Sequence, residues 1–143
     1  MANSWDQFID HLIESSRDKS GEAHIDKACI ISLEDGAPWT SSSHPNVLVL
    51  QGNEGREIST CFKKKDFTYF KSAGVYIEGG YGIFLRESGN SVYARSEGQG
   101  GLTLQASSKA IIIARCPRNQ RYKHGLMNEA VHKLVGYLTS LDF

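Results

Sequence analysis

The sequence predicts an α+β domain built on one mixed or antiparallel sheet, and three observations favour it. Amphipathic helical patterns stand near both ends of the chain, in residues 4–15 and 124–143. Between residues 74 and 116, short β-rich runs alternate with glycine-bearing turns. The length of 143 residues, of which 40% are apolar and 22% charged, fits one domain spanning 1–143.

The first helix is predicted over residues 4–15. Ser4 and Gln7 have the spacing of a capping box, and Asp6 stands in the first turn, where the helix dipole favours an anion. Apolar residues then follow with helical spacing at positions 5, 8, 9, 12 and 13. This arc is wide enough for its middle to pack on the core while its edge, at Phe8, contacts something else.

The next segments predict two strands and then a helical region. Residues 25–33 are rich in β-branched side chains, and the turn residues at 34–38 lead into a returning strand over 39–43 that starts at Trp39. Residues 44–67 favour one or two short helices broken near Gly52, with Pro45 suited to a helix start.

The second half of the chain predicts a meander and a closing helix. Turns are expected at 79–80, 89–90, 98–101 and 107–108, and the unbroken apolar run at 110–114 is typical of a central strand buried on both faces. The closing helix has one apolar stripe, widened by Met127, Val131 and Val135, with Tyr137 at its edge. The residues of that stripe are Leu126, Ala130, Leu134, Leu138 and Leu141.

No catalytic or metal-binding pattern emerges from the sequence. It has no glycine-rich nucleotide motif and no nucleophile elbow, and its five histidines do not have the spacing of metal ligands. Cys29, Cys61 and Cys116 are widely spaced and odd in number, which favours a reducing compartment over a disulfide framework or a zinc site. Cys29 is expected to be a small core residue. We therefore expect a binding protein, not an enzyme, with no cofactor and no metal.

Charge and hydropathy favour a cytosolic protein with an acidic and a basic end. No apolar run approaches a membrane span, and the first residues lack the features of a signal peptide. Residues 1–35 hold eight acidic side chains against three basic ones, whereas residues 98–128 hold five basic side chains and no acidic one. The basic end could meet an acidic protein or lipid head groups, or it could be an ordinary solvated surface.

The two ends of the chain carry large aromatic residues. Trp5 and Phe8 lie in the first helix, and Tyr137 and Phe143 lie in the closing segment. Chain ends fray unless something holds them. We expect these residues both to dock on the core and to present aromatic surface to a partner.

Four segments together resemble the profilins in order and spacing over essentially the whole chain. They are SWDQFIDHLI at 4–13, ACIISLEDGAPW at 28–39, GGYGIFLRE at 79–87, and HGLMNEAVHKLVGYL at 124–138 followed by Phe143. The resemblance implies a central antiparallel meander with the N- and C-terminal helices packed together on one face and short helices on the other. It implies a monomeric, cytoplasmic, cytoskeleton-associated adaptor that regulates actin polymerisation and does not bind nucleic acid. Its partners would be monomeric actin, proline-rich proteins such as formin-type segments, and acidic phosphoinositides.

By resemblance, proline-rich peptides would bind in a groove between the terminal helices. The residues at the matching positions are Trp5, Phe8, Trp39, Tyr137, Leu138 and Phe143. Aromatic grooves recognise the stiff polyproline II helix by packing rings on proline faces and bonding its free carbonyls. Phe8 and Phe143 lack the hydroxyl that many relatives carry, which implies a somewhat lower affinity.

The actin surface implied by the resemblance comes from the meander and the start of the closing helix. Its residues are Tyr81, Phe84, Arg86, Arg95, Lys123, Gly125, Asn128 and Glu129. Tyr81, Glu97 and Glu129 depart from the basic residues common in relatives, and Lys133 replaces a frequent acid. Glu129 and Lys133 could keep an internal i, i+4 ion pair. An alternative hypothesis is therefore a polyproline-binding module with weakened or lost actin binding.

Two basic groups are candidates for phosphoinositide binding. One is Lys63, Lys64 and Lys65 with Lys71, and the other is the basic run over 109–123 that includes Arg115, Arg118 and Arg121. Basic clusters gain about 1 kcal/mol per residue near an anionic surface.

Overall fold

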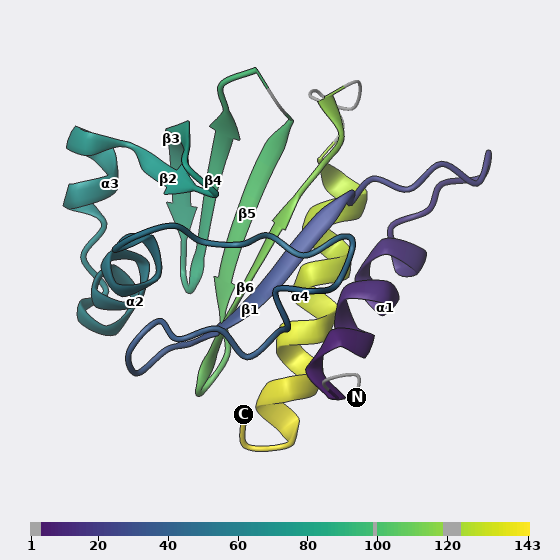
Figure 1. Ribbon diagram of the computed structural model, residues 1–143, viewed down its shortest axis with the longest axis horizontal. Coiled ribbons are helices and arrows are strands. Elements are labelled where there is room, and N and C mark those ends of the chain that lie inside the picture. The colour runs from purple at the N-terminus through teal and green to yellow at the C-terminus, as the bar shows by residue number, and fades with distance from the viewer. Residues whose placement is uncertain (1–3, 99, 119–123) are drawn as a thin grey trace.

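The computed structural model describes residues 4–98, 100–118 and 124–143, which form one six-stranded antiparallel sheet with helices around it (Figure 1). The strand order is β1-β6-β5-β4-β3-β2. The elements are a 3₁₀ turn η1 (Ser4–Asp6), α1 (Gln7–Ser15), β1 (Lys27–Ser32), α2 (Glu54–Lys64), α3 (Thr68–Ala73), β2 (Val75–Ile77), β3 (Gly80–Ser88), β4 (Ser91–Ser96), β5 (Gly101–Ala106), β6 (Ala110–Arg115) and α4 (Gly125–Ser140).

The predicted meander is confirmed. Strands β2 to β6 follow one another in both chain order and sheet order, and β1 pairs with β6 at the end of the series, Lys27 opposite Arg115. Residues 110–114 of β6 are fully buried between β1 and β5, as the apolar run predicts. A strand with neighbours on both edges and cover on both faces tolerates only apolar side chains.

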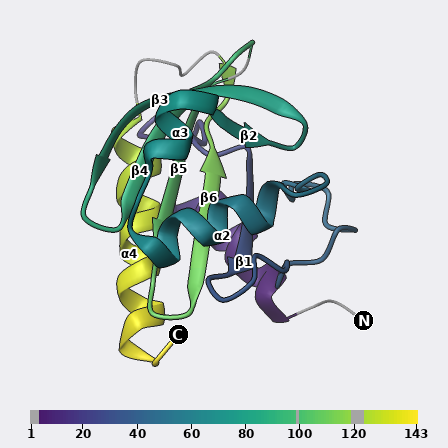
Figure 2. The same ribbon diagram turned by 90° about the vertical axis from the view of Figure 1, so that its left-hand side faces the viewer.

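The terminal helices lie side by side, α1 against β1 and α4 across β5 and β6. Their apolar stripes supply Ile9 and Leu12 from α1 and Val131, Leu134 and Leu138 from α4 to the core. Helices α2 and α3 lie away from this pair, across the sheet (Figures 1 and 2). The predicted placement of terminal and short helices is therefore confirmed.

The start of the first helix differs from the prediction. Helix α1 begins at Gln7 after the 3₁₀ turn, and its N-cap residue is Asp6, which makes no side-chain capping bond. The Asp6 carboxylate instead accepts a hydrogen bond from the Ser41 amide at 2.7 Å. The capping box at Ser4 and Gln7 was wrong because Ser4 lies in the 3₁₀ turn and the α-helix begins only at Gln7.

The predictions for residues 39–50 were also wrong. Residues 39–43 do not form a strand and 44–50 do not form a helix; instead, the segment 37–48, which we call the edge segment, runs along the outer edge of β1. It bonds the outward main-chain groups of β1, including the Ala28 carbonyl to the Leu48 amide (3.0 Å) and the Ile30 carbonyl to the Trp39 amide (2.8 Å). An edge strand left open is a template for aggregation, and the edge segment closes it.

The three cysteines all lie among the described residues, are buried and form no disulfide. Burial raises the pKa of the Cys29 thiol, and it raises the pKa of the Cys61 thiol to about 11. Both thiols are therefore neutral at physiological pH, and Cys29 is confirmed as a core residue. Helix α2 begins soon after Gly52, as predicted, whereas α3 was not predicted separately.

Candidate functional site

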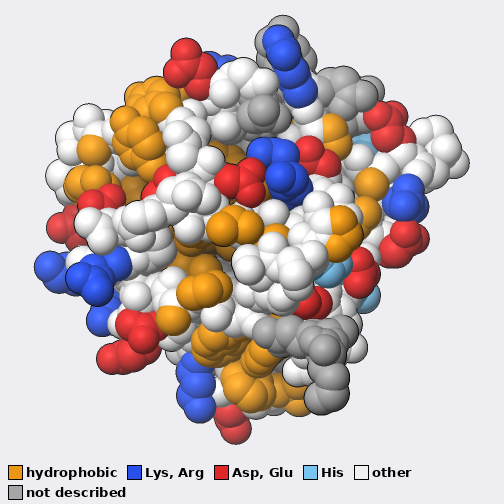
Figure 3. All heavy atoms as spheres, viewed as in Figure 1, with side chains coloured by type: hydrophobic (Ala, Val, Ile, Leu, Met, Phe, Trp, Pro, Cys, Tyr) orange, Lys and Arg blue, Asp and Glu red, His pale blue; other side chains and the backbone are white. Residues whose placement is uncertain are grey.

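Five aromatic rings, which we call the aromatic cluster, come together where both described ends of the chain meet the edge segment. Trp5 lies 4.7 Å from Trp39, 5.6 Å from Phe8 and 5.4 Å from Phe143, measured between ring centroids. Phe8 lies 6.4 Å from Tyr137. Figure 3 shows hydrophobic side chains gathered at the end of the molecule where both termini lie.

Hydrogen bonds hold the main chain at two of the five ring-bearing residues. The Trp39 amide donates to the Ile30 carbonyl of β1, and the Phe143 amide donates to the Leu138 carbonyl, each at 2.8 Å. The main-chain oxygen of Phe143 also accepts hydrogen bonds from the Ser107 hydroxyl, at 2.7 Å, and from the Lys109 amide. The main chain that carries Trp39 and Phe143 is therefore held in place by hydrogen bonds to the sheet, to the β5–β6 turn and to α4.

The aromatic cluster remains partly open to solvent. The exposed fractions are 53% for Tyr137 and 38% for Phe143, while Trp5, Phe8 and Trp39 are half-buried. Leu138 is only 1% exposed, so this predicted groove residue supports the surface from beneath. Exposed aromatic rings with indole and phenol groups suit an apolar ligand that has free carbonyls.

A second surface forms where β3 and β4 extend beyond α4. Ile83 pairs with Arg95 and Arg86 pairs with Tyr93, so these side chains share one face of the sheet. The Arg86 guanidinium stacks 4.2 Å above the Tyr93 ring. Tyr81 lies on the same face, two residues before Ile83, and is 39% exposed.

The start of α4 completes this second surface. The His124 ring lies over Gly101, which pairs with Arg95, so the first turn of α4 stands beside the exposed Arg95. Glu129 and Lys133 form the expected i, i+4 ion pair, at 3.1 Å. We call Tyr81, Arg86 and Arg95 of the sheet, with Gly125, Asn128 and Glu129 of α4, the α4-side surface.

Two of the predicted actin residues do not join that surface. Phe84 pairs with Ala94 and turns to the opposite face, where its half-buried ring lies 5.8 Å from the Lys71 ammonium. A bulge between Phe84 and Arg86 shifts the register by one residue, so these two side chains lie on opposite faces although they are two residues apart. Lys123 lies outside the described residues.

The predicted lipid-binding residues are divided among separate places. Lys63 and Lys64 are exposed in the last turn of α2, and Lys65 follows in a left-handed conformation, with φ of 52°. Arg118 is exposed and follows the end of β6, whereas the three lysines belong to α2 and the residue after it. Arg121 lies outside the described residues.

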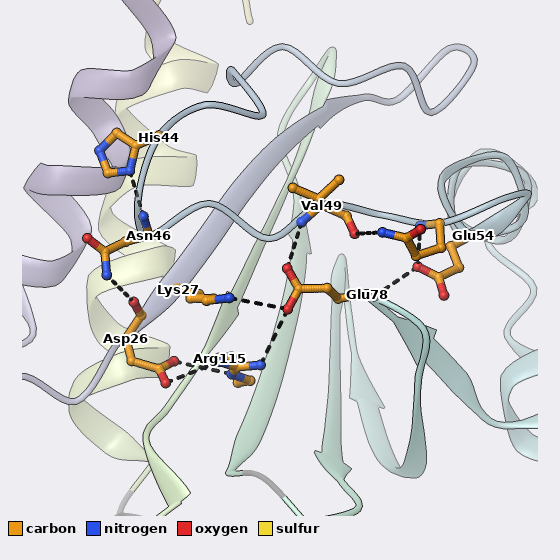
Figure 4. A network of polar contacts seen from close by, with 9 residues as sticks. Asp26, Lys27, His44, Asn46, Val49, Glu54, Glu78 and Arg115 are labelled. Carbon is orange, nitrogen blue, oxygen red and sulfur yellow. Dashed lines mark hydrogen bonds and ion pairs between the residues drawn. The ribbon is translucent and has the colours of Figure 1, made fainter.

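Arg115 is a correction to the predicted lipid set. Its side chain is 14% exposed and donates through Nε and Nη2 to both carboxylate oxygens of Asp26, each at 3.3 Å. Its Nη1 lies 3.7 Å from Glu78, which also accepts from the Val49 amide at 3.0 Å (Figure 4). Arg115 thus connects β6 to the residue before β1 and to the β2–β3 turn. Its guanidinium is engaged by Asp26 and Glu78 of this chain.

A separate cavity is lined by none of the five rings of the aromatic cluster. It measures about 580 Å³ and opens between residues 35–42 and 47–56, over Cys29 and Ile31 of β1. Within the described ranges, no three His, Cys, Asp or Glu side chains lie close enough to hold a metal ion. No helix among those ranges has the length and apolar character needed to span a membrane.

Sequence reasoning missed several residues beside these surfaces. Gln7, His11 and Lys133 stand next to Phe8 and Tyr137 in the groove between α1 and α4. Their signal was helical spacing, since His11 lies one turn from Phe8 and Lys133 one turn from Tyr137. Tyr93 and the exposed Ile83 were also missed on the α4-side surface, although strand alternation places both there.

Comparisons with known proteins agree with this architecture. The family model described as Profilin matches residues 3–143. A profilin from Clypeaster japonicus is 49% identical over 139 residues, covering 96% of this chain and 98% of the relative.

Solved structures share the fold at lower identity. Acanthamoeba castellanii profilin IA has a TM-score of 0.76 at 21% identity, covering 98% of this chain and 100% of that one. Mouse profilin IIa, solved in complex with a double repeat from the FH1 domain of mDia1, has a TM-score of 0.73 at 18% identity, covering 98% and 99%. The match of the family model, the relative at 49% identity and the shared fold together show that this chain belongs to the profilin family.

Proposed function

We propose that this chain is an actin-monomer-binding adaptor that also holds proline-rich peptides on the aromatic cluster, and so regulates actin polymerisation. The observation that carries the proposal is the convergence of five rings, from both described ends of the chain and from residue 39, on one partly exposed surface. Membership of the profilin family supports the same function. The alternative, a peptide-binding module without actin binding, is not favoured.

The chemistry of the aromatic cluster suits a polyproline II helix. That helix has no internal hydrogen bonds and little conformational freedom to lose on docking. Proline rings would pack on Trp5, Phe8, Trp39 and Phe143, and the indole and phenol groups would donate to its carbonyls. The complex of mouse profilin IIa with an FH1 double repeat points to formin-type partners.

A fluorescence titration with decaproline tests this proposal, because Trp5 and Trp39 are the only tryptophans in the chain. We expect a saturable change in emission that is lost in Trp5→Ala and Tyr137→Ala variants that stay folded by circular dichroism. An unchanged spectrum at millimolar peptide would reject the aromatic cluster as a peptide site. Tyr69→Ala is a suitable control, since Tyr69 is a similarly exposed tyrosine on α3.

We propose that actin binds the α4-side surface. Arg86 and Arg95 offer forked donors to acidic groups, and Tyr81 and Ile83 offer apolar area beside them. The departures at Tyr81 and Glu129 then alter the rim of the interface, where charge mainly sets the association rate.

We also propose that Lys63, Lys64 and Lys65 bind acidic phosphoinositides, and that the protein acts in the cytoplasm. The three lysines are consecutive and exposed, and no hydrogen bond or ion pair of their side chains to a described residue is seen. Cosedimentation with phosphoinositide vesicles should fall in a Lys63→Gln/Lys64→Gln/Lys65→Gln variant. Equal binding by the variant would refute the lysine site.

A further inference from the structure

The cavity over Cys29 and Ile31 has no part in the proposed function. We call it the β1 cavity; its volume of about 580 Å³ lies within the range of small-molecule sites. Residues 35–42, residues 47–50 and the start of α2 surround it. In Figure 3, which has the view of Figure 1, hydrophobic side chains reach the surface between the places of α2 and β1.

The floor of the β1 cavity is apolar. Cys29 and Ile31 of β1 are each 1% exposed, Leu48 is buried beside them, and Leu50 is half-buried. Burial raises the pKa of the Cys29 thiol, so the floor carries no charge at physiological pH. An apolar group of a ligand would therefore leave water favourably by covering this floor.

Two glycines form one wall of the β1 cavity. The main chains of Gly36 and Gly55 lie so close together that a Cβ on either residue would overlap the carbonyl oxygen of the other. Gly36 has a φ of 78°, which glycine adopts readily and other residues do not. This wall is therefore made of closely packed backbone, and its shape does not depend on flexible side chains.

Polar side chains around the floor have unused hydrogen-bonding capacity. Thr40 is buried, and its hydroxyl oxygen accepts from the Ile30 amide at 3.2 Å. The hydrogen of that hydroxyl remains available, since no acceptor for it is seen among the described residues. Asn53 is the N-cap residue of α2 but makes no side-chain capping bond. Both side chains can donate to an oxygen atom of a ligand.

The charges on the lining favour one anionic group. Of the described residues that line the β1 cavity, Arg56 is the one base and Asp35 the one acid. Arg56 is exposed in the first turn of α2, where the helix dipole also favours an anion, and no ion pair between it and a described residue is seen. Asp35 already accepts a hydrogen bond from the Ala37 amide at 2.9 Å. One guanidinium matches one carboxylate, whereas a ligand with several phosphates would lack bases and meet Asp35.

We propose that the β1 cavity binds small organic acids in which an apolar body carries a single carboxylate. The apolar body would cover Ile31 and Leu48. The carboxylate would pair with Arg56, with Thr40 and Asn53 as further donors. This site is independent of the proposed peptide and actin functions, because no residue of the aromatic cluster or of the α4-side surface lines it.

Titration of the labelled protein with phenylbutyrate, followed through backbone amide chemical shifts, tests the proposal. We expect saturable shifts in residues 35–37 and 47–50. Phenylbutanol, which lacks the carboxylate, should bind roughly tenfold more weakly, because a charged hydrogen bond is lost. Acetate, which lacks the apolar body, should give no saturable shift. Saturating decaproline should leave the affinity for phenylbutyrate unchanged.

Arg56→Gln provides the decisive variant, because it removes the charge and keeps most of the side-chain length. It should weaken phenylbutyrate binding by roughly tenfold. Asp35→Asn should tighten binding by about twofold, since it removes a like charge at an exposed place. Lys63→Gln is the matched control, because Lys63 is exposed on the same helix and does not line the β1 cavity, and it should leave the affinity unchanged. Thermal unfolding checks that the three variants fold.

Four results would overturn the proposal. They are the absence of any saturable shift with phenylbutyrate, equal affinities for phenylbutyrate and phenylbutanol, equal weakening by Arg56→Gln and Lys63→Gln, and displacement of phenylbutyrate by decaproline. The third result would mean a diffuse effect of positive charge along α2, and the fourth would place the probe on the aromatic cluster. None of the four would remove the proposed peptide or actin function.

Discussion

The indole rings of Trp5 and Trp39 lie 4.7 Å apart, and a hydrogen bond between neighbouring residues supports that spacing. The carboxylate of Asp6, next to Trp5, accepts a hydrogen bond from the amide of Ser41, two residues beyond Trp39, at 2.7 Å. The start of α1 and the edge segment are thus held together by a buried carboxylate next to the half-buried rings. A peptide that docks there would lose little free energy in ordering the protein's binding surface, which favours affinity without a large contact area.

Phe8→Tyr should tighten peptide binding. The Phe8 ring is half-buried between Trp5 and Tyr137, and a hydroxyl at its outer end would add a donor for a peptide carbonyl. One such hydrogen bond is worth about 0.5–1.5 kcal/mol, so decaproline affinity should rise about two- to tenfold. Tyr137→Phe, which removes a hydroxyl, should weaken binding by a similar factor. An unchanged dissociation constant for Phe8→Tyr would mean that no carbonyl lies within its reach.

Arg95→Glu should slow association with monomeric actin by roughly tenfold, because a reversed rim charge opposes electrostatic steering. Arg95 is exposed on β4 beside the start of α4. Stopped-flow mixing with labelled actin at several salt concentrations measures the rate, and the effect should fade as salt increases. Lys63→Glu, a charge reversal on α2, serves as the control. Equal rates for Arg95→Glu and the natural sequence would remove the α4-side surface from the actin site.

Arg115→Met should destabilise the fold by about 2 kcal/mol or more. The substitution leaves the Asp26 and Glu78 carboxylates without their shared partner in a partly buried place, and breaking such a pair from one side is costly. Urea unfolding followed by tryptophan emission measures the loss. Phosphoinositide vesicle binding by the folded fraction should not change, whereas a drop there would return Arg115 to the lipid site.

Asp18→Asn should lower stability at neutral pH and reduce its loss in acid. Hydrogen bonds from Ser20, followed by pairing with His24, hold the pKa of the Asp18 carboxyl below its ordinary value of 3.8. Because the folded-state pKa is the lower one, the carboxylate stabilises the fold above about pH 3.8, and this contribution is lost as pH falls further. Urea unfolding at pH 7 and at stepped acidic pH values compares the two proteins. A constant difference between them at all pH values would contradict this account.

Local pattern was enough to predict most of the fold. Helical spacing located α1 and α4, because each helix buries one face, and short β-rich runs between glycine-bearing turns located β2 to β6. The edge segment was mispredicted because its conformation is set by the unpaired groups of β1 and not by its own periodicity. Pro38 and Val47 each form a single bridge to β1, which is too little to leave a strand pattern.

The candidate site, like the fold, could be predicted from the sequence only in part. The aromatic residues could be named because large apolar groups near chain ends are unusual, and the resemblance to the profilins implied a role for them. The exclusion of Phe84 and Arg115 could not be foreseen. A one-residue bulge placed Phe84 and Arg86 on opposite faces, although they are two residues apart, and Arg115 found its partner Asp26 at a separation of 89 residues, which no local window contains.

The coverage of β1 also matters while the chain is being synthesised. The principal partner of β1 is β6, which emerges from the ribosome only after β2 to β5 have been made. An apolar strand waiting that long is open to misassociation with neighbouring chains. The edge segment emerges immediately after β1 and can bond its outward groups at once, much as a chaperone would. The edge segment, which positions Trp39 in the folded protein, is thus also suited to cover β1 during synthesis, before β6 is available.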